Sequence, residues 1–173
     1  MATSTSIVIF GASGDLSHRK LIPALYHLYL KGRMPERFRI FGTAGRNWTD
    51  EDLRRTARGQ LDQLSSKPVN EELWQRFAST ITYHPGNASL PETYSALKTS
   101  LSASEGEAAN RLYYLATPPE YFLEIINGLA GAGMLSEEEG WRRVVIEKPF
   151  GSDLASARSL NESIHAVLQE NKV

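Results

Sequence analysis

Two patterns of apolar residues alternate along the chain, and together they outline its secondary structure. Short runs rich in β-branched and aromatic residues predict five β-strands, at residues 7–10, 38–41, 80–83, 111–116 and 144–146. Between and after these runs, apolar residues recur every three or four positions. That spacing predicts helices over about residues 16–31, 50–64, 73–77, 91–101, 120–129 and 154–168.

Glycine, proline and polar residues mark where these elements end. Gly32 is expected to stop the first helix and Gly42 to close the second strand. Residues 84–87 predict a turn and residues 102–107 a polar loop. Pro23 falls inside the first predicted helix, where it removes a backbone hydrogen bond and should bend the axis.

The regular alternation of strand and helix favours an α/β fold. We expect a Rossmann-like, doubly wound and mainly parallel sheet with helices on both faces. In such a sheet the strands end at one edge, and ligands bind there. This rule selects residues 11–15, 42–46, 116–119 and 147–149, which are far apart in sequence and meet only in the folded sheet. The shared edge is the main functional prediction of the pattern.

The first of these loops joins a buried strand to a helix through two glycines. Backbone N–H groups and the positive end of a helix dipole then point at one spot, which suggests a phosphate or pyrophosphate site. The loop departs from G-x-G-x-x-G, because Ser13 and Leu16 replace the second and third glycines. A merely structural turn is therefore the alternative. Asp15 would repel a phosphate, so we expect its carboxylate to cap N–H groups of the helix.

The loop after the second strand bears on the choice of coenzyme. NAD-binding domains normally place Asp or Glu here to bind the ribose hydroxyls. Residues 41–46 contain no carboxylate but do contain Arg46, which favours the 2′-phosphate of NADP over NAD. The alternative interpretation is an arginine that simply faces solvent.

Lys148 follows the fifth strand directly and is held by Pro149, which restricts the local backbone. A lysine in this position could anchor a phosphate or hydroxyl of a substrate as a point charge, or be purely structural. The histidines have no metal-ligand spacing and no cysteine partners, so we expect no metal site.

The composition narrows the classes of function. A chain of 173 residues, 41% hydrophobic and 23% charged, fits one domain better than two. The net charge of -1 and the scattered basic residues argue against binding to nucleic acid or to a membrane surface. The chain has no cysteine, which excludes disulfides and a thiol nucleophile. With no signal peptide or long apolar run, we expect a cytoplasmic protein.

Four segments, in this order, resemble one known family. They are G-A-S-G-D-L at 11–16, K-L-I-P at 20–23, N-R-L-Y-Y-L-A-T-P-P at 110–119 and E-K-P-F-G at 147–151. Together they resemble the N-terminal coenzyme domain of glucose-6-phosphate dehydrogenases, over nearly the whole chain. The resemblance implies oxidation of glucose 6-phosphate to 6-phosphogluconolactone, the first step of the oxidative pentose phosphate pathway, with hydride transfer to NADP or, in some members, NAD.

The resemblance also implies which residues bind. One group would form the turn around the coenzyme phosphates, a second would lie by the adenosine ribose, and a third would line the path toward the nicotinamide. The implied coenzyme residues are Gly11, Ala12, Ser13, Gly14, Asp15, Leu16, Thr43, Arg46, Ala116, Thr117, Pro118, Glu147 and Lys148. Lys148 would in addition contact the sugar phosphate, with Glu147 and Pro149 fixing its approach.

The chain departs from the family pattern in two ways. Gly45 stands where many members have arginine, with Arg46 one place later, so the preference for NADP is weakened and NAD is possible. The second departure is that the substrate segment R-I-D-H-Y-L-G-K and the general-base histidine of the family are absent from these residues. Removal of the proton from the sugar C1 hydroxyl needs a base, and we expect only His18 among the histidines at the active edge.

These departures lead to the expected domain organisation. We expect residues 1–173 to form an NADP-binding domain without the α+β catalytic and dimerisation domain, and to be monomeric and inactive alone. The full-length enzyme would be a homodimer or homotetramer acting on glucose 6-phosphate. The alternative is a stand-alone NADP-binding sensor or scaffold without catalysis.

Overall fold

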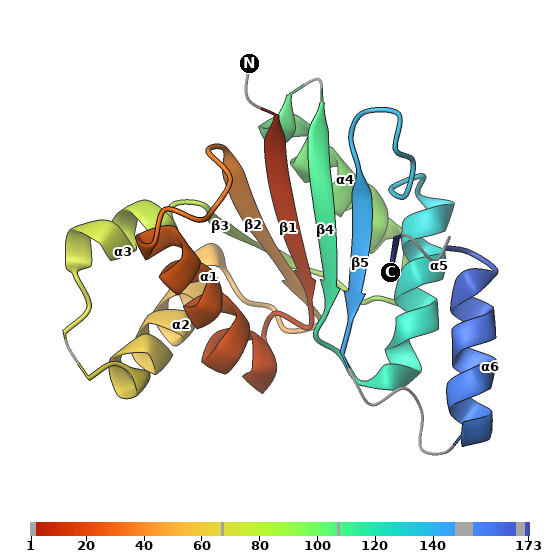
Figure 1. Ribbon diagram of the computed structural model, residues 1–173, viewed down its shortest axis with the longest axis horizontal. Helices are drawn as coiled ribbons and strands as arrows, with labels where there is room; N and C mark the ends of the chain where they lie inside the picture. The colour runs from red at the N-terminus through yellow and green to blue at the C-terminus, as the bar shows by residue number, and fades with distance from the viewer. Residues whose placement is uncertain (1–2, 67, 107, 148–153, 169–171) are drawn as a thin grey trace.

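A five-stranded sheet lies at the centre of the molecule (Figure 1). The computed structural model describes residues 3–66, 68–106, 108–147, 154–168 and 172–173. The strands are β1 (Ser4–Phe10), β2 (Phe38–Ala44), β3 (Ile81–Pro85), β4 (Ala109–Leu115) and β5 (Arg142–Ile146). All four pairings are parallel, and the strand order is β3-β2-β1-β4-β5. The direction of the order reverses beside β1, which is the topological switch point of a doubly wound fold.

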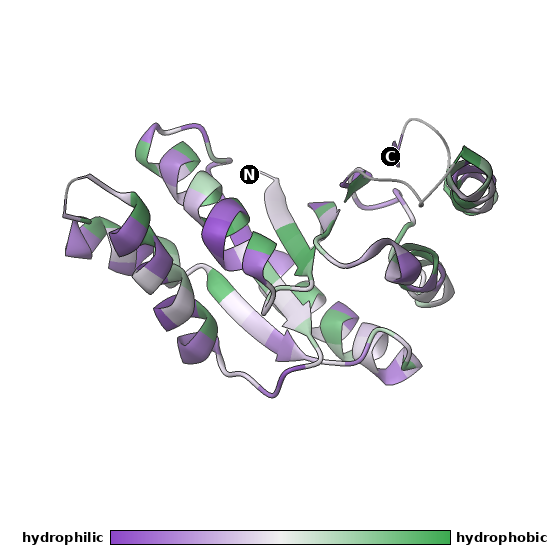
Figure 2. Ribbon diagram, turned by 90° about the horizontal axis from the view of Figure 1, so that it is seen from below, coloured by the Kyte–Doolittle hydropathy of each residue, from purple (hydrophilic) through white to green (hydrophobic). Residues whose placement is uncertain are grey.

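Helices cover both faces of the sheet (Figure 2), as the sequence predicts. A π-helical turn, η1 (Ser17–Leu21), leads into the helices of one face: α1 (Ile22–Leu30), α2 (Asp50–Leu64) and α3 (Glu71–Ala78). The helices of the other face are α4 (Pro91–Glu105) and α5 (Phe122–Gly131), which follows the 3₁₀ turn η2 (Pro119–Tyr121), with α6 (Leu154–His165) packed against α5. None of these described helices is long and apolar enough to cross a membrane.

Strand β1 divides the hydrophobic core into two layers. Ile7 and Ile9 pack with the residues of α1, α2 and α3, whereas Val8 and Phe10 pack with those of α4 and α5. Successive strand residues point to opposite faces, so a strand covered on both sides must be apolar at every position of its centre. This is why the run at residues 7–10 was recognisable from the sequence.

Strand β2 continues through Gly42 to Ala44, so the expectation that Gly42 closes the strand is wrong. The glycine is needed for close packing instead. A Cβ at position 42 would lie 2.7 Å from Ala12 Cβ and 2.8 Å from a methyl group of Leu53. Strand β3 likewise runs to Pro85, through part of the turn predicted at residues 84–87.

Helix α4 extends to Glu105, which corrects the polar loop predicted over residues 102–107. Glu105 is only 3% exposed and forms an ion pair with the equally buried Arg111 of β4. A tertiary contact, rather than local propensity, therefore fixes the end of this helix.

The first predicted helix is divided in two. The N–H of Ile22 donates to Ser17 O, five residues earlier, so the chain makes a π turn before α1 begins. Pro23 stands in the first turn of α1, where its missing N–H costs least. The bend of the axis predicted at Pro23 stays a prediction. The predicted stop at Gly32 is confirmed by its positive φ of 63°.

Glu137 holds the loop that precedes β5. Its carboxylate accepts hydrogen bonds from Arg142 N (2.8 Å) and Arg143 Nη1 (2.6 Å) and pairs with Lys172 Nζ (3.2 Å). The backbone bond from Arg142 is the main reason that the pKa of Glu137 falls to about 2. A carboxyl whose pKa is lowered on folding stabilises the protein above its unfolded pKa and loses this contribution as the pH falls.

We expect Glu137→Gln to be less stable than the native chain at pH 7, because the neutral amide accepts weaker hydrogen bonds. The difference should shrink between about pH 5 and pH 2, since the native carboxyl also becomes neutral there. Urea unfolding at pH 7, 5, 3 and 2 measures this, with Glu138→Gln as the control for an exposed neighbour. Parallel pH profiles for the native chain and Glu137→Gln would contradict the prediction.

Candidate functional site

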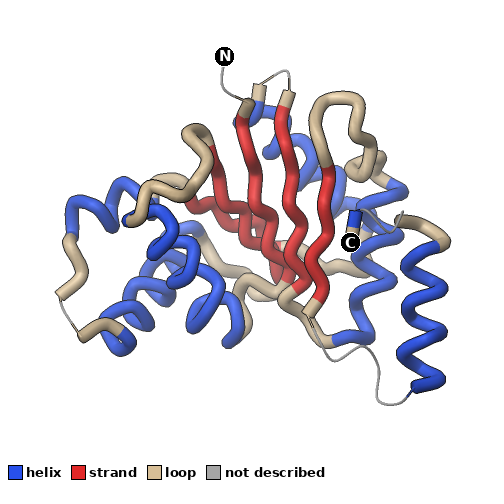
Figure 3. Tube along the Cα trace, in the orientation of Figure 1, coloured by secondary structure: helices blue, strands red, loops and turns tan. Residues whose placement is uncertain are grey.

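The strands end at one edge of the sheet (Figure 3). A cavity of about 250 Å³ lies at this edge. It sits on the side of α4 and α5, next to the switch point between β1 and β4. Its wall combines loops from four strands with the start of α4 and α5. The lining residues are Phe10, Gly11, Thr43, Ala44, Gly45, Gly86, Asn87, Ala88, Thr93, Thr117, Pro118, Tyr121 and Ile125.

Gly11 joins three of these strands by backbone contacts. Its N–H donates to Thr43 O (2.9 Å), and its own carbonyl accepts from Gly14 N (2.9 Å). Gly11 has a positive φ of 80°, and a Cβ here would lie only 2.4 Å from Ala116 O. The tight turn predicted at residues 11–15 is therefore present, and glycine is required at its first position by both backbone angle and space.

Asp15 does not cap the helix, which corrects its expected role. No side chain caps η1, and the Asp15 carboxylate instead accepts a hydrogen bond from Arg19 Nη1 at 3.0 Å, both side chains being exposed. Asp15 and Leu16 already belong to the helix that runs into η1, so Asp15 stands inside the first turn and not at the N-cap position. The first N–H groups of this helix therefore donate to no capping side chain. A helix start that binds an anion needs N–H groups in this state.

Charged residues of both the first and the second of these loops affect the pKa of His18. Both ring nitrogens are buried, and neither has a hydrogen-bond partner in the part of the chain that the structure describes. Burial lowers the pKa of His18, nearby Asp15 opposes this shift, and the charges of Arg19 and Arg46 add to it. The imidazole is therefore held neutral at pH 7, and the positive charge at this edge comes from the arginines.

Tyr83 holds the loop after β2 in place. Its hydroxyl donates to Ala44 O (3.1 Å) and Arg46 O (2.8 Å), and burial raises its pKa. The Arg46 guanidinium lies 5.5 Å above the centre of the Trp48 ring, and the side chain is exposed. No Asp or Glu occurs from Gly42 to Thr49. The loop thus offers a fixed backbone and a cation without a competing carboxylate.

Two buried hydroxyl groups in the cavity wall have no hydrogen-bond partner among the described residues. They are Thr43 Oγ1 and Thr117 Oγ1, at the ends of β2 and β4. Buried polar groups are nearly always hydrogen-bonded, so these atoms fit a ligand that brings its own polar groups. The wall therefore suits a nucleotide coenzyme with ribose hydroxyls and phosphates.

Glu147 follows β5 at the same edge and is exposed. Its carboxylate accepts a hydrogen bond from the Tyr114 hydroxyl. Burial, and secondarily this bond, raise the pKa of Tyr114 to about 12. Lys148 and Pro149 lie outside the described residues, so their implied roles stay predictions.

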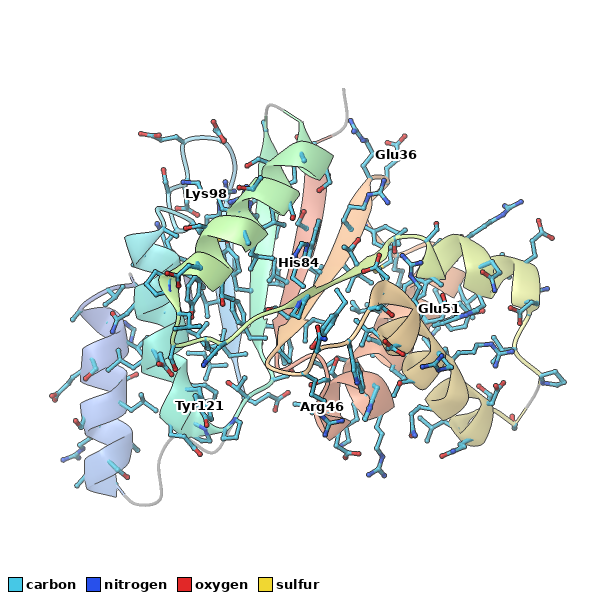
Figure 4. All side chains as sticks on the ribbon, turned by 180° about the vertical axis from the view of Figure 1, so that it is seen from behind. Glu36, Arg46, Glu51, His84, Lys98 and Tyr121 are labelled. Carbon is cyan, nitrogen blue, oxygen red and sulfur yellow. The ribbon has the colours of Figure 1, made fainter. Side chains whose placement is uncertain are left out.

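The structure brings only part of the implied coenzyme set to the cavity itself. Gly11, Thr43, Thr117 and Pro118 line it. Ala12 and Ser13 are buried in the adjoining turn, Gly14, Leu16 and Ala116 are half-buried, and Asp15 and Arg46 are exposed at the outer side. Arg46 and Tyr121 lie at the same end of the molecule in Figure 4.

Sequence reasoning missed the wall formed by residues 86–88 and by Tyr121. The carboxyl-edge rule, applied also to the third strand, would have found residues 86–88. The same omission concealed His84, which pairs in register with Thr43 and corrects the expectation that His18 alone lies at this edge. His84 stacks on Phe41 and has a buried, unpartnered Nε2, and burial lowers its pKa. No group of three possible metal ligands occurs among the described residues.

Comparison with known proteins identifies the family. The model of the glucose-6-phosphate dehydrogenase NAD binding domain matches residues 8–173. Glucose-6-phosphate 1-dehydrogenase of Chlamydia muridarum is 41% identical over 175 residues, covering 96% of this chain and 34% of that protein. The enzyme of Bacillus subtilis is 39% identical over 170 residues, with the same two shares.

Solved structures agree with this result. A glucose-6-phosphate dehydrogenase in complex with its substrate glucose-6-phosphate superposes with a TM-score of 0.88 at 35% identity, covering 99% of this chain and 36% of that one. The chain thus spans about a third of the length of the relatives it matches. On fold, sequence and coverage, the chain belongs to the glucose-6-phosphate dehydrogenase family and corresponds to its NAD binding domain.

Proposed function

We propose that residues 1–173 form the NADP-binding domain of an enzyme that oxidises glucose 6-phosphate to 6-phosphogluconolactone with hydride transfer to the coenzyme. The observation that carries this proposal is the cavity at the switch point, where Gly11 lets the loop after β4 approach β1 closely and where the Thr43 and Thr117 hydroxyls have no partner among the described residues. When bound, the coenzyme accepts the hydride. The protein's part is to hold its phosphates at the start of η1 and its ribose beside the loop after β2.

Arg46 supports NADP over NAD as the coenzyme. It lies at the end of β2, where a carboxylate would favour the free ribose hydroxyl, and its guanidinium is a fork of donors that suits a phosphate. Trp48 beneath it is a natural fluorescent reporter. Titration of the chain with NADP and with NAD should give saturable binding of both, tighter for NADP. Absence of binding by either coenzyme would refute the assignment.

Arg46→Ala is expected to weaken NADP binding about 10- to 100-fold, the effect of losing a hydrogen bond to a charged group. NAD binding should change by less than about threefold, because NAD has no 2′-phosphate. Calorimetry measures both affinities without relying on Trp48, and Arg37→Ala, exposed before the amino end of β2, is the control. Equal losses for NADP and NAD would show that Arg46 does not read the 2′-phosphate.

For the reaction itself, we propose that these residues bind the coenzyme and make part of the substrate contact through Lys148. They provide no general base. Neither His18 nor His84 is among the described residues that line the cavity, so neither is placed to take a proton from a sugar hydroxyl there. The 173 residues should therefore bind coenzyme without measurable oxidation of glucose 6-phosphate. Turnover at the rate of an ordinary dehydrogenase by this chain alone would overturn that part of the proposal.

A further inference from the structure

Two buried arginines lie side by side at the end of the sheet opposite the coenzyme cavity. Arg111, in the first half of β4, is in register with Arg142, the first residue of β5. Their exposed fractions are only 5% and 4%. Like charges placed directly across two strands repel each other, and burial increases the cost. This arrangement requires compensating negative charge.

The described residues supply one buried carboxylate for the two guanidinium groups. Glu105 accepts from Arg111 Nε (3.0 Å) and Nη2 (2.6 Å). Among the described residues Arg142 has no such partner: its Nη1 donates to backbone carbonyls, among them Ala109 O (2.5 Å) and Gly140 O (3.1 Å), and its Nε is buried without an acceptor. Within the buried group of Glu105, Arg111 and Arg142, two positive charges therefore face one negative charge.

Both arginines open into a separate cavity of about 200 Å³ between the ends of α4 and α5. Lys98 and the hydroxyl-bearing Ser102 and Ser136 complete its polar wall. Lys98 lies at the opposite end of the molecule from Arg46 (Figure 4). The cavity is thus distinct from the coenzyme site and does not depend on the proposed function.

Other charges around this cavity offset the positive charge only in part. Glu138 and Glu139 also line it, and the charge of Glu139 acts on Arg142, but both residues are exposed, so water screens them more than the buried Glu105. Glu137 is already engaged by Arg143 and Lys172. Lys98 Nζ donates to Ala132 O at 2.8 Å, so it adds positive charge without requiring a carboxylate.

We propose that this cavity binds a phosphate group, with Arg142 and Arg111 as its charged donors. Guanidinium groups are planar, remain charged when buried and form charge-assisted hydrogen bonds with phosphate oxygens. The unpartnered Nε of Arg142 supplies a donor, and the serine hydroxyls adapt to the remaining oxygens. The bound anion neutralises the excess charge of the buried cluster, so binding stabilises the folded domain.

The first test is thermal unfolding in inorganic phosphate, compared with sodium chloride at equal ionic strength. Phosphate at ten times its dissociation constant should raise the melting temperature by about 3–6 °C. Arg46→Ala must retain this response, which separates the cavity from the coenzyme loop. A phosphomonoester is measured in parallel, and the tighter binder of the two shows whether the source is free phosphate or a phosphorylated metabolite. A response no greater than that to chloride would overturn the proposal.

The second test places a carboxylate inside the cavity. Ser102→Glu should abolish the phosphate response and melt at a higher temperature than Ala103→Glu in phosphate-free buffer. Ala103 is the matched control, because it is exposed on the same turn of α4 but does not line the cavity. Retention of the full response by Ser102→Glu would refute the site.

A direct readout does not depend on a variant that folds. The Nε–H signal of Arg142 in the ¹⁵N NMR spectrum of the native chain should shift saturably with phosphate, at the same concentrations that raise the melting temperature. An Arg142 signal that stays fixed while the melting temperature rises would place the phosphate elsewhere and overturn the proposal.

Discussion

Replacement of Glu105 by glutamine is expected to lower the free energy of unfolding by about 3–5 kcal/mol, the effect of removing one partner from a buried ion pair. Glu105 and Arg111 are 3% and 5% exposed, and the guanidinium binds the carboxylate through two nitrogens. The amide keeps the shape of the side chain but not its charge. Arg111 and Arg142 would then remain buried together without any buried carboxylate among the described residues.

Urea unfolding measures this loss, and an exposed pair provides the control. Glu72 and Arg76 are joined at 2.7 Å on α3, but their side chains are 75% and 65% exposed. Glu72→Gln should therefore cost less than about 0.5 kcal/mol. The double replacement Glu105→Leu with Arg111→Met should recover most of the stability, because it removes both charges. A loss below about 1 kcal/mol for Glu105→Gln would show that the pair is not isolated from water.

Glu105 also shows a limit of prediction from sequence. The segment around it is rich in serine, alanine and glycine, and by local propensity it is a polar loop. The helix continues because Arg111, six residues later and on a different element, needs a buried carboxylate at this point. A contact between elements outweighs a preference of about 1 kcal/mol or less per residue, and no local pattern records it.

Residues of the sheet centre were predictable for the opposite reason. In β1, Ile7 and Ile9 face one layer of helices while Val8 and Phe10 face the other, so the entire run must be apolar. The alternation of strand and helix predicted that the strands are parallel. Parallel strands end at one edge, and this predicted the functional edge. The pattern of hydrophobic residues alone is enough to predict this part of the fold.

The candidate site was predictable as a set of loops but not as a cavity. Gly11 and Thr43, which the sequence selects, line the cavity, whereas the contribution of residues 86–88 depends on the true end of β3. The predicted capping role of Asp15 is wrong because the helix already includes Asp15 and Leu16, a fact of backbone conformation that residue type does not reveal. A hydroxyl group without a hydrogen-bond partner can be recognised only from the positions of all the atoms around it, which a sequence does not contain.

The second large effect is expected from Gly11→Ala, which should abolish measurable NADP binding and destabilise the domain by about 2–5 kcal/mol. The alanine incurs about 1–2 kcal/mol for a left-handed backbone at φ 80°. Its Cβ would also lie 2.4 Å from Ala116 O, so the loop after β4 must move away from the turn. That movement displaces Thr117 and opens the cavity between β1 and β4, where we place the coenzyme.

Gly32→Ala separates the two causes, because Gly32 has a similar positive φ of 63° but nothing within 4 Å of a Cβ. It should therefore cost only about 1–2 kcal/mol and leave NADP affinity unchanged. Urea unfolding and calorimetric titration with NADP measure both variants. If Gly11→Ala loses no more stability than Gly32→Ala and still binds NADP, then the close approach of β1 and β4 is not needed, and the coenzyme does not depend on this turn. If Gly11→Ala alone loses binding, the contact between these two strands is what shapes the site.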